Sequence, residues 1–295
     1  MFDFTAAERS TLDALLDAWA EKPTVGPTVQ NEEGEDIVLP VPESGLGSGH
    51  NVALYFMDLD SGASYSYNAE ARFSAASLPK APFAAYLYQQ AALGACDLDE
   101  YITVTPAHVA GSEEHTGVLK TYELPAAFSV EALIGLMIRE SDTVALRVLM
   151  AHYGTEGFTA WAEALGASAE DIADVLNARI CANDGGIFAL ELYKTMQENP
   201  YGALLREHME NTRQTMITSN YPVARKYGWD RAAYHDMAVV YAPHPYLLVI
   251  LTDKWGGTGW ETATFGLIAS EVENMVAQKW AGLEGAASLS LLPAG

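Results

Sequence analysis

The order of helical and strand-like segments predicts an α+β (αβα) fold: an antiparallel sheet flanked by N- and C-terminal helices, with an all-helical lobe inserted into it. Strand-like runs occur towards both ends of the chain, at Val52 to Leu59 and at Tyr246 to Thr252. Helical periodicity fills most of the sequence between them. Because this insert separates the two sets of strands, we expect the two ends of the chain to meet in one sheet layer.

The chain opens with an amphipathic helix. Thr5 and Glu8 have the spacing of a capping box, in which each side chain accepts a hydrogen bond from the other residue's backbone N–H. Apolar residues then recur at helical intervals, at Leu12, Leu15, Leu16 and Trp19. This apolar stripe requires a sheet or another helix to cover it.

A hairpin follows a stretch rich in Pro, Gly and Glu between residues 26 and 49. Val52 to Leu59 is typical of a strand, Asp60-Ser61-Gly62 of a turn, and Ser64 to Tyr67 alternates as a second strand.

Three segments predict helices in the insert. The first runs from Ser77 to about Leu93, with Pro79 in its first turn, where the missing N–H costs least. Ser129 has the position of an N-cap for the second, which carries Leu133, Leu136 and Met137. The third is marked by Phe158, Trp161 and Leu165.

Strands return after Pro222, and a last helix ends the chain. Met237 to Tyr241 and Tyr246 to Thr252 are joined by the turn residues Pro243-His244-Pro245. The final helix carries apolar residues at Phe265, Ile268, Val272 and Met275. We therefore expect residues 1–75 and 221–295 to form an α/β sheet lobe, residues 76–220 to form a helical lobe, and the active site to lie in the cleft between them.

Composition excludes some partners. Sixteen basic and thirty-nine acidic residues give a net charge of −23, which repels nucleic acid and anionic membrane surfaces. Met1 to Trp19 contains acids and no uninterrupted apolar core, so we expect neither a signal peptide nor a membrane span there. Cys96 and Cys181 are too few for a disulfide framework or a zinc cluster, which leaves two free thiols or a single bridge.

Ser77-Leu78-Pro79-Lys80 is the first candidate for chemistry. It places a hydroxyl and an amine three positions apart at the start of a predicted helix. A serine hydroxyl becomes a good nucleophile only when a neighbouring base takes its proton, and a lysine can be that base if its pKa is lowered. This motif alone is weak, because a helix cap followed by a surface lysine has the same pattern.

Two further motifs strengthen the first. Glu140-Ser141-Asp142-Thr143 ends an apolar helix, and Arg225-Lys226-Tyr227-Gly228 enters a strand. Two lysines near one serine would each lower the pKa of the other, leaving a neutral amine accessible near neutral pH. We expect Asp142 to be a structural hydrogen-bond partner.

With these motifs in this order, the chain resembles the serine β-lactamase and penicillin-binding protein superfamily, and within it the class A β-lactamases. The likeness covers roughly Val52 to the end of the chain. Segments that resemble the family are Phe73 to Ser77, Leu136 to Asp142, and Tyr234 through Lys254. The resemblance implies a β-lactamase/transpeptidase-like fold, a small-molecule substrate, no cofactor or metal, a monomer and an extracytoplasmic location.

The resemblance also implies roles for individual residues. Ser77 would be the nucleophile and Lys80 the general base for acylation. Ser141 would shuttle a proton to the leaving nitrogen, and Lys226 would orient Ser141 and the substrate carboxylate. The backbone N–H groups of Ser77 and Trp229 would form the oxyanion hole. Substrate-binding positions would be Thr143, Tyr227, Gly228 and His235.

Several of these positions depart from the family pattern. Thr143 replaces an asparagine that would hold the substrate amide, and Tyr227 replaces a small hydroxyl residue. His235 falls near a carboxylate-binding arginine, so it either supplies a weaker, pH-dependent charge or caps a strand. His115, in the Gly111 to Gly117 segment, either touches substrate or lies on the surface.

The most consequential departure concerns deacylation. Leu176-Asn177 matches the family, but Ala173 occupies the position of the glutamate that activates water. Nearby acids at Glu170, Asp171 and Asp174 either substitute for that glutamate or are simply solvated.

These features favour a serine hydrolase that forms an acyl-serine with β-lactams or D-alanyl peptides and deacylates slowly. Two alternatives stay open: a β-lactam or peptidoglycan-fragment sensor without turnover, and an esterase or amidase on the same fold.

Overall fold

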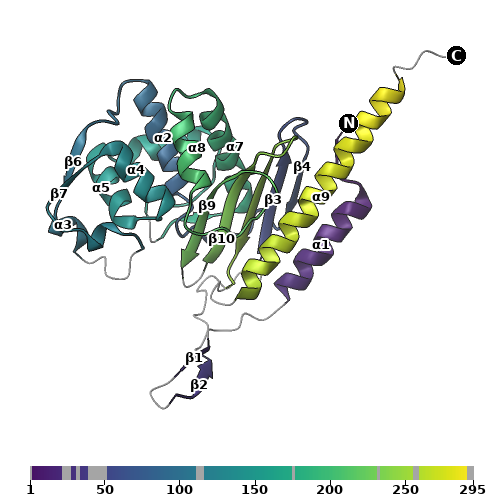
Figure 1. Ribbon diagram of the computed structural model, residues 1–295, viewed down its shortest axis with the longest axis horizontal. Coiled ribbons are helices and arrows are strands. Elements are labelled where there is room, and N and C mark those ends of the chain that lie inside the picture. The colour runs from purple at the N-terminus through teal and green to yellow at the C-terminus, as the bar shows by residue number, and fades with distance from the viewer. Residues whose placement is uncertain are drawn as a thin grey trace.

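An antiparallel sheet lies at the centre of the molecule, between two layers of helices (Figure 1). The computed structural model describes residues 2–21, 28–30, 34–38, 52–110, 116–174, 177–230, 233–254 and 259–290. In spatial order the strands of the sheet are β4 (Ser64–Tyr67), β3 (Val52–Asp58), β11 (Tyr246–Thr252), β10 (Ala233–Val240) and β9 (Val223–Asp230).

The two ends of the chain meet where β3 pairs with β11. Leu54 lies opposite Ile250 in this antiparallel ladder. Every residue of β11 is buried, because helices cover both faces of the sheet. The prediction that one sheet combines strands from both ends of the chain is confirmed.

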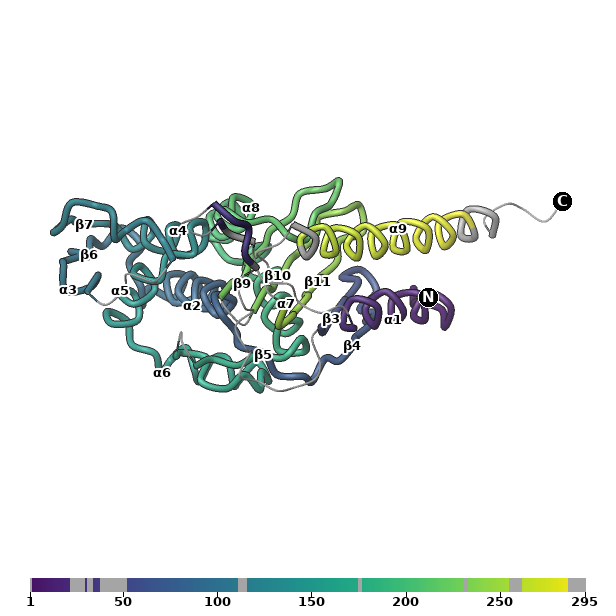
Figure 2. The backbone as a smooth tube through the Cα atoms, turned by 90° about the horizontal axis from the view of Figure 1, so that it is seen from below, coloured from purple at the N-terminus to yellow at the C-terminus, as the bar shows by residue number. Residues whose placement is uncertain are grey.

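The N- and C-terminal helices cover one face of this sheet. Helix α1 (Ala6–Ala20) lies beside α9 (Gly259–Ser290), as Figures 1 and 2 show in purple and yellow. Trp19 packs edge-on against Phe265, with ring centroids 5.1 Å apart. The predicted apolar stripe of the first helix is thus covered by the sheet and by α9.

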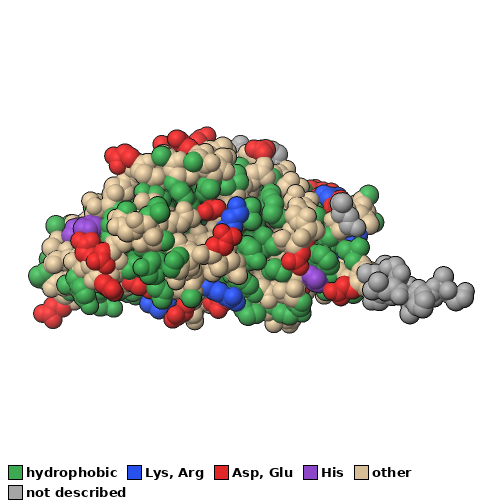
Figure 3. Space-filling view, turned by 90° about the horizontal axis from the view of Figure 1, so that it is seen from above, with side chains coloured by type: hydrophobic (Ala, Val, Ile, Leu, Met, Phe, Trp, Pro, Cys, Tyr) green, Lys and Arg blue, Asp and Glu red, His purple; other side chains and the backbone are tan. Residues whose placement is uncertain are grey.

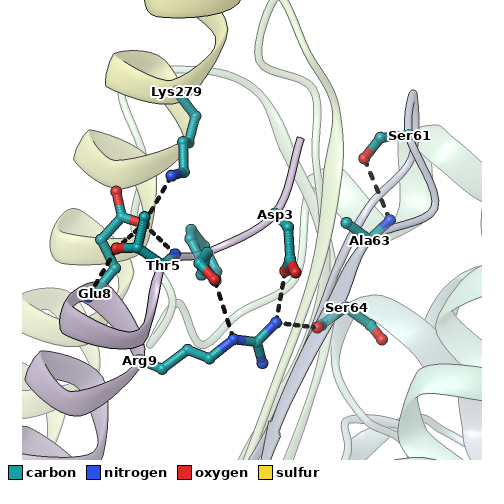
Figure 4. A network of polar contacts seen from close by, with 9 residues as sticks. Asp3, Thr5, Glu8, Arg9, Ser61, Ala63, Ser64 and Lys279 are labelled. Carbon is teal, nitrogen blue, oxygen red and sulfur yellow. Dashed lines mark hydrogen bonds and ion pairs between the residues drawn. The ribbon is translucent and has the colours of Figure 1, made fainter. Parts of the chain in front are cut away.

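Polar contacts fix the start of α1 against the rest of this layer (Figure 4). The capping box between Thr5 and Glu8 is present as predicted. Glu8 also forms an ion pair with Lys279 of α9, with 2.9 Å between the Lys279 nitrogen and a Glu8 carboxylate oxygen. Arg9 forms a second ion pair, with Asp3, at a nitrogen–oxygen distance of 2.5 Å.

The other face of the sheet carries the inserted helices. They are α2 (Lys80–Ala92), α4 (Val130–Arg139), α5 (Thr143–Tyr153), α6 (Glu156–Ala164), α7 (Ala182–Glu198) and α8 (Gly202–Glu210), with short turns α3 (Pro106–Val109) and η1 (Leu119–Thr121). Helix α7 lies directly on the sheet. The contact is so close at Gly185 that a Cβ there would be only 2.7 Å from the Val249 side chain. Ser129 caps α4 as predicted, by accepting the N–H of Ala132.

Some elements were not predicted. Short strand pairs join β1 (Thr28–Gln30) to β2 (Asp36–Val38), β5 (Phe73–Ser74) to β8 (Arg179–Ile180), and β6 (Tyr101–Val104) to β7 (Ala126–Ser129). The helix expected from Ser77 begins at Lys80, because the residues before it form a turn closed by shorter-range bonds, from Leu78 N–H to the Ala75 carbonyl and from Ala81 N–H to the Leu78 carbonyl. Ser77 therefore lies in the turn before α2.

The acidic composition is visible at the surface, and the two cysteines are not bridged. Acidic side chains are distributed around the face shown in Figure 3. Cys96 and Cys181 are both buried and free, so the two-thiol alternative holds. Within the described ranges, no helix has the length and apolar character needed to cross a membrane.

Candidate active site

The turn that carries Ser77 is held from two sides. On one side, the N–H of Ala75 donates to the carbonyl of Ala178 at 2.8 Å, next to the β5–β8 pair. On the other side, Gly228 of β9 packs so closely that a Cβ there would lie 3.2 Å from the Ala75 carbonyl oxygen. The left-handed φ of Ala76 is a strained feature of the kind that collects at functional sites. Together these contacts fix the half-buried Ser77 hydroxyl.

Lys80 connects this turn to the second motif. Its side chain is 1% exposed, and its Nζ lies 3.0 Å from Ser77 Oγ, 3.2 Å from Ser141 Oγ and 3.0 Å from Thr143 Oγ1. It also donates to the carbonyl of Ser141. Burial lowers the pKa of Lys80 to about 7, although the nearby Asp142 carboxylate raises it. The amine therefore gives up its proton far more readily than that of an ordinary lysine.

The Asp142 carboxylate holds the backbone around the second motif in place through hydrogen bonds. It is fully buried and caps α5 by accepting the N–H of Ala145 at 2.9 Å. Its other oxygen accepts the N–H groups of Val118 and Leu119 at 2.6 and 2.8 Å. The expectation that Asp142 is a structural hydrogen-bond partner is confirmed.

Gly117 is required for this arrangement. Its φ is +117°, and a Cβ there would lie 2.2 Å from the Asp142 carboxylate. Ser141 itself has a positive φ of 54°, which aims its side chain back towards α2.

Lys226 of β9 completes the polar cluster. Its side chain is 0% exposed, and its Nζ donates to Ser141 Oγ at 3.0 Å and to the carbonyl of Tyr227 at 2.8 Å. Burial and then the charge of Lys80 lower its pKa well below the ordinary lysine value. The structure thus brings together Ser77, Lys80, Ser141 and Lys226, which come from three separate parts of the sequence.

The remaining predicted residues lie at different depths. Trp229 is 39% exposed and borders a pocket, whereas Gly228 lies under the Ser77 turn. The Thr143 hydroxyl faces Lys80 and lies 3.4 Å from the Thr116 hydroxyl. Tyr227 is buried, and its ring covers the Lys226 ammonium at 3.8 Å from the ring centroid.

His235 is buried, and both of its ring nitrogens lie against backbone groups. One ring nitrogen lies 2.7 Å from the carbonyl oxygen of Ser74, and the other accepts the N–H of Thr252 at 3.0 Å. Burial lowers its pKa to about 4, although the hydrogen bond with Ser74 opposes this shift. Because both ring nitrogens bind backbone groups, the geometry favours the structural alternative for His235 over a substrate contact.

A pocket of about 510 Å³ opens next to Ser141. Its lining combines polar, charged and aromatic residues: Thr116, Gly117, Lys120, Glu140, Ser141, Arg213, Gln214, Tyr227 and Trp229. Lys120, Arg213 and Gln214 were missed in the sequence because they lie outside the three motifs. The only sequence feature that could have pointed to this pocket is that Lys120 and Arg213 are basic residues in a strongly acidic chain.

The loop before α7 carries the acids considered for water activation. Asp171 and Asp174 line another pocket, of about 470 Å³, and none of its described lining residues borders the Ser141 pocket. Glu170 is largely exposed and lies 4.0 Å from Arg72. Ala173 also lines the second pocket. Leu176 and His115 lie outside the described residues.

No metal site is formed by the described part of the chain: its His, Cys, Asp and Glu side chains make no cluster of three or more that could hold an ion.

Comparison with solved structures assigns the class of fold. A mutant of PBP-A, described as an acyl-enzyme complex with penicillin G, superposes with a TM-score of 0.74 at 17% identity, covering 94% of this chain and 98% of that one. A β-lactamase from Sphaerobacter thermophilus DSM 20745 gives 0.71 at 16% identity, with 89% and 95% covered. A β-lactamase from Chitinophaga pinensis DSM 2588 gives 0.71 at 15% identity, with 92% and 99% covered. The fold is that of β-lactamases and PBP-A.

The family follows from the sequence comparison. The model of the Beta-lactamase enzyme family matches residues 44–276, so the chain belongs to this family. As a member, it is a serine hydrolase of the β-lactamase superfamily, and its substrates are small molecules. None of the curated proteins compared with the chain matches it.

Proposed function

We propose that the protein forms an acyl-serine at Ser77 with β-lactams or D-alanyl peptides and releases the acyl group slowly. The observation that carries this proposal is the position of the Lys80 amine, within hydrogen-bond distance of the hydroxyls of Ser77 and Ser141. A buried amine with a lowered pKa is the base that a serine nucleophile needs. The proposal places Ser77 in a cleft between a sheet lobe (residues 1–75 and 221–295) and a helical lobe (residues 76–220).

In the proposed acylation, neutral Lys80 takes the proton of Ser77 while Ser77 Oγ attacks the carbonyl carbon of the substrate. The C–N bond then breaks, and the leaving nitrogen receives a proton from Ser141. Lys80 or Lys226 restores that proton, since both amines lie within 3.2 Å of Ser141 Oγ. Lys80 therefore acts as a general base when Ser77 attacks and as a general acid when it returns the proton to Ser141.

The backbone N–H groups of Ser77 and Trp229 are the proposed oxyanion hole. Two features support this assignment. Gly228 brings β9 against the turn that carries Ser77. In the sheet that the described residues form, β9 is also the last strand, so alternate N–H groups along its outer side lie outside the ladder.

Slow release is proposed because the described acids of the loop before α7 do not line the pocket beside Ser141. Hydrolysis of an acyl-serine needs a positioned proton acceptor for water. Asp171 and Asp174 line a pocket separate from the one beside Ser141. This also supports a second candidate function, a sensor that is acylated once and not turned over.

Labelling with a fluorescent penicillin tests the proposal. The protein is incubated with the label, chased with excess unlabelled penicillin, and sampled over several hours. We expect covalent label that persists. Ser77→Ala should abolish it, whereas Ser66→Ala, which removes an exposed serine on β4, should leave it unchanged. An unlabelled wild-type protein would contradict the proposal, and rapid loss of label would contradict slow deacylation.

A substrate panel separates the remaining alternatives. Nitrocefin, a D-Ala-D-Ala peptide and a p-nitrophenyl ester report lactamase, peptidase and esterase activity. We expect at most slow turnover of nitrocefin. Faster turnover of the ester than of either amide would favour the esterase alternative.

A further inference from the structure

The hydroxyl of Thr116 lies against two of the oxygen atoms that also contact Lys80. It donates to the carbonyl oxygen of Ser141 at 2.8 Å and lies 3.4 Å from the hydroxyl oxygen of Thr143. The Lys80 amine donates to the same carbonyl, and its Nζ lies 3.0 Å from the same hydroxyl oxygen. Thr116 and Lys80 therefore share two neighbours at the second motif.

The backbone fixes Thr116 in this position. The N–H of Thr143 donates to the carbonyl oxygen of Thr116 at 3.1 Å. Further along the same loop, the N–H groups of Val118 and Leu119 donate to the Asp142 carboxylate. The Thr116 side chain thus has a set place beside the second motif, although it belongs to none of the three sequence motifs.

A lysine that acts as a base needs its lone pair aimed at the proton that it accepts. A neutral amine has one lone pair and two N–H donors. The carbonyl oxygen of Ser141 only accepts, so it takes one of the two N–H groups of Lys80. Thr143 Oγ1, at 3.0 Å, is a nearer acceptor for the second N–H than Ser141 Oγ, at 3.2 Å. With both N–H groups engaged in this way, the lone pair is left for the Ser77 hydroxyl, 3.0 Å away.

The Thr143 hydroxyl can either accept a hydrogen bond from Lys80 or donate one to it. Donation would place the Thr143 hydrogen on the lone pair of Lys80, which Ser77 could then not use. The Thr116 hydroxyl has a single hydrogen, and this hydrogen goes to the Ser141 carbonyl. At its contact with Thr143, Thr116 can therefore only accept. The Thr143 hydrogen then turns towards Thr116, and a Thr143 lone pair turns towards Lys80.

We propose that Thr116 is a positioning residue for acylation: it directs the Thr143 hydroxyl hydrogen away from Lys80, so that the amine keeps its lone pair aimed at the nucleophile. The proposal rests on the proposed acylation of Ser77. The need for such a residue comes from Thr143, because an asparagine at this position would offer a carbonyl oxygen, which only accepts. Thr116 also lines the pocket beside Ser141, so the test must separate positioning from a direct contact with substrate.

Rapid kinetics with benzylpenicillin separate these two roles. The rate constant of the acylation step and the dissociation constant of the noncovalent complex are measured for the wild type, Thr116→Val and Thr116→Ser. Thr116→Val keeps the shape of the side chain without its hydroxyl. It should slow the acylation step by about 3- to 10-fold, the usual effect of one hydrogen bond, and change the dissociation constant by less than about twofold. Thr116→Ser, which keeps the hydroxyl, should stay within about twofold of the wild type in both constants.

Thr121→Val is the matched control, because it removes a threonine hydroxyl that donates to the carbonyl of Val118 in the same loop. Its acylation step should stay within about twofold of the wild type. Equal losses in Thr116→Val and Thr116→Ser, a change confined to the dissociation constant, or no change in Thr116→Val would each overturn the proposal.

A double-mutant cycle tests whether Thr143 is the reason. Thr143→Val removes the hydrogen that Thr116 is proposed to direct. Thr116→Val should therefore slow the acylation step less in that background than in the wild type. An unchanged cost would contradict the directing role of Thr116.

Neutron diffraction from crystals of the deuterated protein locates the hydroxyl hydrogens without any substrate. The crystals are kept at about pH 9, above the Lys80 pKa of about 7, so that the amine carries a lone pair. We expect the Thr116 deuterium at the Ser141 carbonyl and the Thr143 deuterium between the two threonine oxygens. If this arrangement were seen but the wild type were not acylated, the proposed function would fail and the hydroxyl arrangement would stand. A Thr143 deuterium that faces Lys80 would overturn the inference.

Discussion

Lys80 shows how burial can lower the pKa of a lysine towards that of a useful base. Its partners are hydroxyls and a carbonyl, and Asp142, the carboxylate that acts on it, is occupied by backbone N–H groups. Desolvation therefore outweighs the stabilising charge, and the pKa falls to about 7. The motif predicted the residue, but only the three-dimensional packing gives the shift, because the groups around it come from distant parts of the sequence.

The pH dependence of acylation should follow this pKa. Because the neutral amine is the active form, the second-order rate constant for acylation should rise as the pH increases through about 7 and level off above it. Lys80→Arg should be inactive over this range, since a guanidinium does not lose its proton. Stopped-flow measurement between pH 5 and pH 9 checks both. A rate that does not change across this window would contradict Lys80 as the base.

The same burial should cost stability. The folded-state pKa of about 7 lies below the ordinary lysine value of 10.5, so unfolding takes up a proton between these pH values. The contribution of Lys80 to the free energy of unfolding therefore rises as the pH increases from about 7 to 10.5. Lys80→Met should raise the free energy of unfolding by about 1–4 kcal/mol at pH 7, and the gain should shrink towards pH 10.5. Urea unfolding measures it, with Lys194→Met, at an exposed lysine, as control. A loss of stability at pH 7 would contradict this account.

At the scale of elements, the loop between α6 and α7 is held in place by polar contacts at its two ends. Arg72 pairs with the buried Asp184 at 2.9 Å and donates to Ser168 at 2.8 Å. The β5–β8 pair then ties the loop to the segment before Ser77. The end of the loop is thus held next to the segment that carries Ser77, while its acids Asp171 and Asp174 line a pocket other than the one beside Ser141.

Substitution of the loop acids should leave deacylation unchanged. Glu170→Gln, Asp171→Asn and Asp174→Asn should each alter the lifetime of the acyl-enzyme by less than about twofold, because a group that does not activate water contributes nothing to the roughly 10²- to 10⁴-fold effect of a general base. Release of a fluorescent penicillin measures the lifetime. A lifetime at least tenfold longer in any one variant would identify that acid as the missing base.

Elements with strong local signals were predictable, and those made by long-range pairing were not. The capping box at Thr5, the N-cap at Ser129 and the strand Tyr246–Thr252 follow from local spacing. The two-residue strands β5 and β8 have no periodicity, because they exist only through their pairing with each other. The positive φ of Ala76 likewise has no signal in the local sequence, and it lies where the chain packs against Gly228 of β9.

At the scale of the whole molecule, the sheet separates the layer of α1 and α9 from the layer of inserted helices that carries the candidate site. Helices α1 and α9 cover one face, while Ser77, Lys80 and Ser141 lie on the side of the inserted helices. The order of elements predicted this layering, because the two ends of the chain can bury their apolar stripes only against a shared sheet. The pocket with Lys120 and Arg213 was not predictable, since no spacing connects loops that meet only in the folded protein.

This separation can be tested with a core substitution remote from the site. Trp19 is buried between α9 and the sheet. Trp19→Ala should lower the free energy of unfolding by about 3–5 kcal/mol. The acylation rate per folded molecule should stay within about twofold of the wild type. A folded variant with a much slower acylation would show that the α1 layer does more than stabilise the sheet.

Mapping the acylated residue tests the central claim most directly. After incubation with penicillin G, the intact mass should rise by that of the whole antibiotic, and peptide mass spectrometry should place the adduct on Ser77. The adduct should be absent in Ser77→Ala and strongly reduced in Lys80→Arg. An adduct on another residue, or equal modification of the Lys80→Arg protein, would contradict a serine activated by this buried amine.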